Sequence, residues 1–231
     1  MSTEDFDSVR RDPDPIRRGK RATELLTTYQ QRATELARLR KAVGPVSIGV
    51  PYRYQTTDRE RPLIAAEDAE TANQLEALLT ALSLATSRYQ IEPDRTEPPA
   101  GDTIVVCGPK SAPIGADLLS RDPALAMIED NGRWWIEQRE DSTRIGSPSD
   151  DAQPQSADVA YVARHMIDNR VIIHIAGIHG IGSLGATHYL RAHLADVFRQ
   201  VGQQPMSLVA RATYDGLTIT DSELAAGPYV W

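Results

Sequence analysis

A glycine-rich turn near the C-terminus has the residue types and spacing that most suggest ligand chemistry. The segment Gly180-Ile-Gly-Ser-Leu-Gly185 matches G-x-G-x-x-G and stands between an apolar stretch and a stretch with helical periodicity. Glycines permit a tight turn and close backbone approach, and free N–H groups at a helix start favour a phosphate or another anion. No acidic residue follows until Asp196, so the positive end of the helix dipole has no local counter-charge. We therefore predict a ligand loop over residues 178–185 that includes His179, Gly180, Gly182, Ser183 and Gly185.

Two other interpretations of this turn stay open. A tight strand-to-helix turn that serves only packing has the same glycine pattern. A dinucleotide fold is less compatible, because the turn stands too near the C-terminus to leave strands for a full nucleotide-binding sheet. In addition, the first acidic residue at a following strand end is Asp215, beyond the spacing of about twenty residues that the fingerprint requires.

A second glycine turn repeats the same design earlier in the chain. Residues 103–107 are apolar, and Gly108, Lys110 and Ser111 follow them before a helical stretch. A lysine and a hydroxyl at a strand end can meet an anion, although a solvated loop has the same composition. Open α/β sheets bind ligands where the carboxyl ends of neighbouring strands flank a crevice, and we expect the two turns to do so here.

Other chemical signatures are missing from the sequence. There is no G-x-x-x-x-G-K-[ST] segment, no zinc-ligand spacing of Cys and His, and no nucleophile elbow or paired-carboxylate motif. His174 lies inside an apolar strand and is expected to be a buried, hydrogen-bonded core residue. Asp158 and Arg164 are interpreted mainly as surface charges, with a role at the crevice as the alternative. We predict no metal site and no cofactor, and the sequence leaves any catalytic residue unknown.

The elements that must hold these residues alternate between strands and helices. Apolar runs predict strands at residues 46–52, 103–107 and 170–178, and periodicity predicts helices at 68–84, about 114–120 and 182–201. Residues 158–164 fit either a strand or a short helix. Asn131-Gly132 and Asp215-Gly216 predict hairpin turns. The expected fold class is therefore α/β: a layered domain over residues 44–231 with a mostly parallel central sheet plus antiparallel edge hairpins.

The N-terminal part is expected to differ from this domain. Residues 1–14 are polar and acidic and predict a disordered tail. Asp14-Pro15 is a helix-start signal, so residues 15–43 are predicted to form one long helix. Its narrow apolar stripe favours either packing on its own domain or self-association with a second copy or a protein partner.

Composition and charge narrow the class of protein. The net charge is -7, with +3 on residues 1–42 and -10 on the rest, which is a poor match for a nucleic-acid surface. No apolar run approaches the roughly 20 residues of a membrane span, and the N-terminus is not a secretory signal. Cys107 is the single cysteine. We expect a soluble, cytoplasmic protein.

Several segments together resemble a family of uncharacterised actinobacterial regulators. They are residues 21–41, Val-Val-Cys-Gly-Pro-Lys110, Gly-Arg-Trp-Trp135 and Ile-Ala-Gly-Ile-His-Gly-Ile-Gly-Ser-Leu-Gly185. The resemblance implies a leading helix, a helix-turn-helix DNA-binding segment and a C-terminal α/β sensor-like domain. Here Lys41 passes almost directly to Gly44-Pro45, so the helix-turn-helix is missing and DNA binding is not carried over.

The sequence therefore favours a regulatory or sensor-like protein that binds a small anionic ligand, such as a nucleotide, at the two glycine turns. One alternative is an enzyme that acts on a nucleotide or a phosphorylated metabolite in the same crevice. The other is an interaction protein without a ligand.

Overall fold

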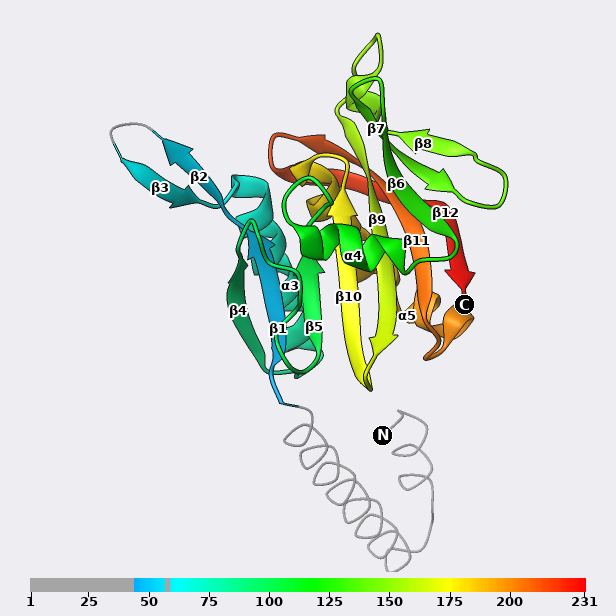
Figure 1. The fold of residues 1–231 in the computed structure, drawn as a ribbon. Helices are drawn as coiled ribbons and strands as arrows, with labels where there is room; N and C mark the ends of the chain where they lie inside the picture. The colour runs from blue at the N-terminus through cyan, green and yellow to red at the C-terminus, as the bar shows by residue number, and fades with distance from the viewer. Residues whose placement is uncertain (1–43, 57–58) are drawn as a thin grey trace, which may run out of the picture. The chain divides into compact units, whose positions relative to one another are not determined.

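A seven-stranded mixed sheet forms the centre of the protein (Figure 1). The computed structural model describes residues 44–56 and 59–231, so the predicted tail at 1–14 and helix at 15–43 lie outside the described residues. The compact unit of the fold begins at Pro45. The sheet has the order β12-β11-β9-β10-β5-β1-β4. Its strands are β1 (Val46–Pro51), β4 (Thr86–Ile91), β5 (Thr103–Val106), β9 (Ala157–Ile167), β10 (Arg170–Gly177), β11 (Met206–Asp215) and β12 (Thr218–Val230).

The prediction of a mostly parallel α/β sheet was wrong. Strands take 43% of the structure and helices 27%, and the sheet divides into a parallel and an antiparallel half. Strands β4, β1, β5 and β10 run parallel, whereas β9, β11 and β12 join them through antiparallel pairs. Three of the six strand pairs in the central sheet are thus antiparallel, and they are not an edge addition.

The physical reason for the error lies in β9 and β10. Both strands are covered on both faces over most of their length, and strands buried in this way are mostly apolar whatever the direction of their neighbours. Asp168 and Asn169 between them adopt positive φ angles of 50° and 59°. Such a pair makes the tight turn that joins antiparallel strands, and it sets β9 beside β10.

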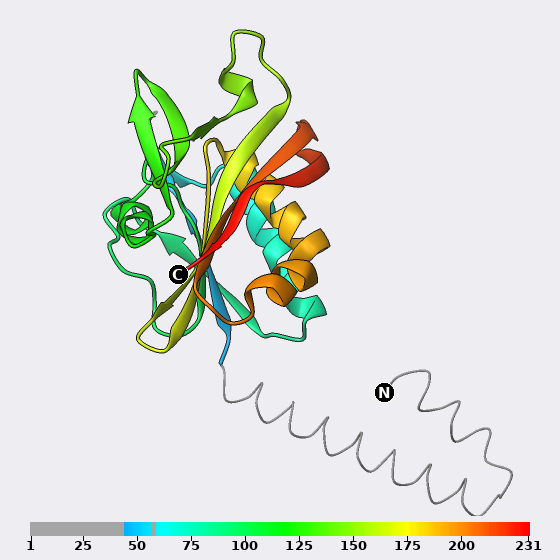
Figure 2. The same cartoon turned by 90° about the vertical axis from the view of Figure 1, so that its right-hand side faces the viewer.

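Helices cover one face of the sheet, and a helix with a small second sheet covers the other (Figure 2). The first face carries α3 (Ala66–Ala81) and α5 (Gly180–Val201). The second face carries α4 (Pro113–Ser120) and the small sheet. The small sheet consists of β6 (Leu125–Asp130), β7 (Arg133–Gln138) and β8 (Arg144–Gly146), with the 3-10 turn η1 (Pro148–Asp150) after it. Strand residues alternate between the faces: Ile104 and Val106 pack with α3 and α5, and Val105 packs with α4.

Local turn chemistry explains the remaining connections. The predicted hairpins are confirmed: Asn131-Gly132 joins β6 to β7, and Asp215-Gly216 joins β11 to β12. A further hairpin, β2 (Arg53–Thr56) with β3 (Glu60–Leu63), projects from the end of β1 (Figure 1). Within the described residues, no helix has the length and apolarity needed to cross a membrane.

The parallel half of the sheet sets the position of the site. Strands β1, β5 and β10 lie side by side and end at the same edge. Helices α3, α4 and α5 each follow one of these strands in the chain, so their N-termini return to that edge. Open α/β sheets bind ligands at this edge.

Candidate functional site

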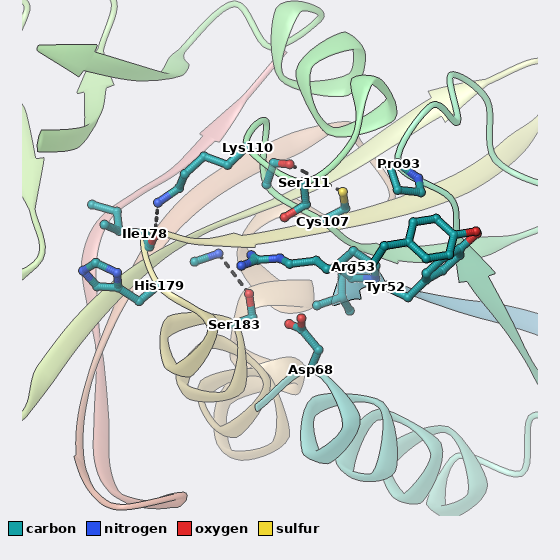
Figure 3. Close-up of a pocket in the computed structure, with 16 residues that line it drawn as sticks. Tyr52, Arg53, Asp68, Pro93, Cys107, Lys110, Ser111, Ile178, His179 and Ser183 are labelled. Atoms are coloured by element: carbon teal, nitrogen blue, oxygen red, sulfur yellow. Dashed lines mark hydrogen bonds between the residues drawn. The ribbon is translucent and has the colours of Figure 1, made fainter. Parts of the chain in front are cut away.

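A cavity of about 630 Å³ opens at the carboxyl ends of β1, β5 and β10 (Figure 3). Three segments that are distant in the sequence line it, because each follows one of the three strands. They are residues 51–54 after β1, residues 106–108 with 110–111 after β5, and residues 177–180 after β10. Asp68, Pro93 and Ser183 complete the wall. The expected crevice between the two glycine turns is therefore present in the structure.

A hydrogen bond from Lys110 connects the two glycine turns. Its Nζ donates a hydrogen bond of 2.7 Å to the carbonyl oxygen of Ile178, and it lies 5.1 Å from the ring centroid of Trp134. Burial lowers the pKa of Lys110, and the nearby Asp158 and Asp150 partly oppose this shift. An ammonium group has three donors, so Lys110 still has N–H groups for a ligand beside its structural bond.

The start of α5 carries a counter-charge that the sequence analysis missed. Asp158 on β9 is only 1% exposed, and its Oδ2 accepts a 3.0 Å hydrogen bond from the N–H of His179. The expectation of a surface role for Asp158 was wrong, because β9 is buried on both faces. Burial raises the pKa of Asp158. Its only sequence signal is an acid inside an apolar run. The α5 dipole is thus partly compensated from a distant strand.

The three glycines of the G-x-G-x-x-G segment have different surroundings. Gly180 lines the cavity. A Cβ on Gly182 would lie 2.5 Å from Oδ2 of Asp158 and 2.7 Å from the carbonyl oxygen of Val159. A Cβ on Gly185 would lie 2.4 Å from that of Ala212. Gly182 and Gly185 therefore let α5 approach β9 and β11, and neither lines the cavity.

Ser183 and His179 both line the cavity at the α5 start but make different contacts. Ser183 lines the cavity, and its hydroxyl accepts a 2.9 Å hydrogen bond from the N–H of Gly177. His179 is at the solvent side, where its Nε2 lies 2.9 Å from Oδ1 of Asp150 in η1. The imidazole is thus held by a carboxylate at the rim of the cavity.

The cavity also contains residues that the sequence analysis did not select. Arg53 and Tyr54 lie on β2, and Tyr52 precedes them directly after β1. The hydroxyls of Tyr52 and Tyr54 are 3.1 Å apart, and this contact raises the pKa of Tyr52 to about 12. Asp68 lies in the first turn of α3 and is 9% exposed. The available signal was positional: these residues follow β1 or open α3, as Lys110 follows β5 and Ser183 opens α5.

Gly108 and Ser111 line the cavity beside Lys110, so the second predicted turn contributes all three of its selected residues. The buried core position predicted for His174 is confirmed, with its Nε2 2.7 Å from the carbonyl oxygen of Cys107. Among the residues that the structure describes, no group of three or more His, Cys, Asp or Glu could hold a metal ion.

Comparison of this chain with protein-family models, curated proteins and solved structures finds no match.

Proposed function

We propose that this protein is a ligand-sensing regulatory protein that binds a small anionic molecule in the cavity between the two glycine turns. The resemblance to actinobacterial regulators without their DNA-binding segment fits this role. The cavity supports an anionic ligand, because its lining combines two backbone turns with the cationic side chains of Arg53 and Lys110.

The observation that carries the proposal is Arg53. Its side chain lines the cavity, and no hydrogen bond or ion pair engages it within residues 44–56 and 59–231. Figure 3 shows the guanidinium reaching toward the α5 start, near Ser183. A guanidinium presents a planar set of donors that suits a phosphate or a carboxylate. Lys110, Ser111 and the backbone at Gly108 and Gly180 also line the cavity and can supply further donors.

The test is a thermal-shift and calorimetric titration with inorganic phosphate, ribose 5-phosphate and AMP. We expect at least one phosphate compound to raise the melting temperature of the wild type. Arg53→Ala should lower the affinity for that compound by about 10- to 100-fold, because a charge-assisted hydrogen bond contributes about 1.5–3 kcal/mol. Arg191→Ala is the matched control, since Arg191 is exposed on α5 and does not line the cavity. No response to any of the three compounds, or equal affinity in Arg53→Ala, would refute the proposal.

A second candidate function is an enzyme that acts on a phosphorylated metabolite in this cavity. The His179–Asp150 pair favours it, because a carboxylate that orients an imidazole is a common arrangement for general acid–base chemistry. Phosphorus NMR of each binding compound over hours separates the two functions. Turnover that His179→Gln abolishes, with binding retained, would favour the enzyme.

A further inference from the structure

Asp68 stands apart from the other buried aspartates of the described structure. Three aspartates are buried there: Asp68, Asp122 and Asp158. Asp122 accepts hydrogen bonds from the backbone N–H groups of Ala124 and Leu125, and Asp158 accepts one from His179. The carboxylate of Asp68 has no hydrogen-bond or ion-pair partner in the described part of the chain.

The carboxylate of Asp68 faces the cavity. Asp68 is 9% exposed and belongs to the cavity wall. In Figure 3 it points from α3 toward the space between Ser183 and Arg53. Burial raises its pKa from 3.8 to about 6, and the positive charge of Arg53 only partly opposes this shift. The cavity leaves the oxygens of this carboxylate accessible, whereas one oxygen of Asp122 and one of Asp158 are buried without a partner, so Asp68 is the buried aspartate that a partner from outside the chain can reach.

The chemistry of that partner follows from the neighbouring charges. An ionised carboxylate only accepts hydrogen bonds, so the ligand must present donors to it. The nearby Arg53 charge disfavours a cationic group at this point, which favours neutral donors, and hydroxyls are among them. Two adjacent hydroxyls match the two oxygens of one carboxylate, as they do in nucleotide sites where an acidic residue holds the ribose.

Part of the cavity lining is apolar and aromatic, and in Figure 3 Tyr52 and Pro93 lie on the side away from Lys110 and His179. Pro51, Tyr52 and Pro93 form this part, and the rings of Tyr52 and Tyr54 lie 5.3 Å apart in an edge-on arrangement. Ligand cavities commonly combine such an apolar wall with a few polar groups that fix orientation. A flat ring system would lie against this wall.

We propose that Asp68 binds the vicinal hydroxyls of a ribose, and that the ligand of this cavity is therefore a ribonucleotide. Its phosphate would lie at Arg53 and the glycine turns, its ribose at Asp68 and its base against Tyr52 and Pro93. The placement of the phosphate rests on the proposed function above.

The experiment is isothermal titration at pH 7.5 with AMP, 2′-deoxy-AMP, adenosine and inorganic phosphate. We expect the wild type to bind AMP about tenfold more tightly than 2′-deoxy-AMP, since a hydrogen bond to a charged group contributes about 1.5 kcal/mol or more. Asp68→Ala and Asp68→Asn should both reduce this preference, and Asp68→Asn guards against an effect of lost volume. Asp117→Asn should keep the wild-type preference, because Asp117 is an exposed residue of α4 paired with Arg121.

The outcomes separate this inference from the proposed function. Equal affinity for AMP and 2′-deoxy-AMP in wild type and Asp68→Ala would overturn the ribose assignment while the anion site stands. Binding of adenosine with no added affinity from the phosphate of AMP would support Asp68 and overturn the anion site. No binding of any of the four compounds would overturn both.

Discussion

Replacing Asp68 by Asn should stabilise the ligand-free protein at neutral pH. The substitution keeps the shape of the side chain and removes a buried charge that has no partner within the described structure. Binding sites commonly retain such destabilising groups because function requires them, and substitutions there can raise stability while they lower affinity.

The size of the effect follows from proton linkage. The pKa of Asp68 is about 6 in the folded protein, against 3.8 for the free side chain, so the folded state binds this proton more tightly. The free energy of unfolding therefore falls as the pH rises from 3.8 to 6, and it stays lowered above that range. At about 1.4 kcal/mol per pKa unit, the cost is about 3 kcal/mol at pH 7.5 and about 1 kcal/mol at pH 4.5. A gain of 3 kcal/mol corresponds to a rise of roughly 6–12 °C in Tm for a domain of this size.

Urea denaturation at pH 7.5 and pH 4.5, followed by tryptophan fluorescence, measures this difference. We expect Asp68→Asn to be more stable than wild type at pH 7.5, with most of the gain lost at pH 4.5. Asp122→Asn is the control: its carboxylate already accepts two backbone N–H groups, so the same substitution should bring no gain. An Asp68→Asn variant that is less stable at pH 7.5, or whose gain is the same at both pH values, would refute the reasoning.

Two further substitutions test the core and the packing of α5. His174 is fully buried, and burial lowers its pKa from 6.5 to about 4, so wild type should lose about 3 kcal/mol relative to His174→Gln between pH 7 and pH 4. If the free energy of unfolding of the two proteins changed with pH in the same way, His174 would not gain a proton on unfolding and the prediction would be wrong. Gly182→Ala should lower the free energy of unfolding, measured by urea denaturation, by roughly 1–3 kcal/mol. The added Cβ would lie 2.5 Å from Oδ2 of Asp158, and the strain of this contact outweighs the gain in helix propensity of about 1 kcal/mol. Gly108→Ala is its control, since a Cβ there meets only the carbonyl oxygen of Gly177 at 3.8 Å, and equal losses in the two variants would contradict the packing argument.

Much of the local structure could be predicted from the sequence. The strands β1, β5 and β10, the helix α5 and the hairpins at Asn131-Gly132 and Asp215-Gly216 all lie close to their predicted positions. These features depend on the periodicity and turn preferences of residues a few positions apart, which are independent of the rest of the chain. For the same reason, the selection of Gly108, Lys110 and Ser111 from their place after an apolar strand led to residues of the cavity wall.

Direction and burial could not be predicted in this way. The sequence does not distinguish a buried parallel strand from a buried antiparallel one, so β9 and β11 were not expected inside the central sheet. The burial of Asp68 has no local sequence signal, and that of Asp158 has only the apolar run around it, because the elements that cover both residues come from distant parts of the chain. Arg53 likewise gains its place only because β1 ends beside β5.

By itself, the sequence determined the positions of β1, β5, β10, α5 and two hairpin turns, and that two glycine turns follow apolar strands. Only the tertiary structure decided which residues those turns contact. Lys110 bonds to Ile178 across 68 positions, and Asp158 bonds to the N–H of His179 across 21. Local preferences act between neighbours in the chain, whereas burial, counter-charge and close packing are set by neighbours in space, and these decided the chemistry of the cavity.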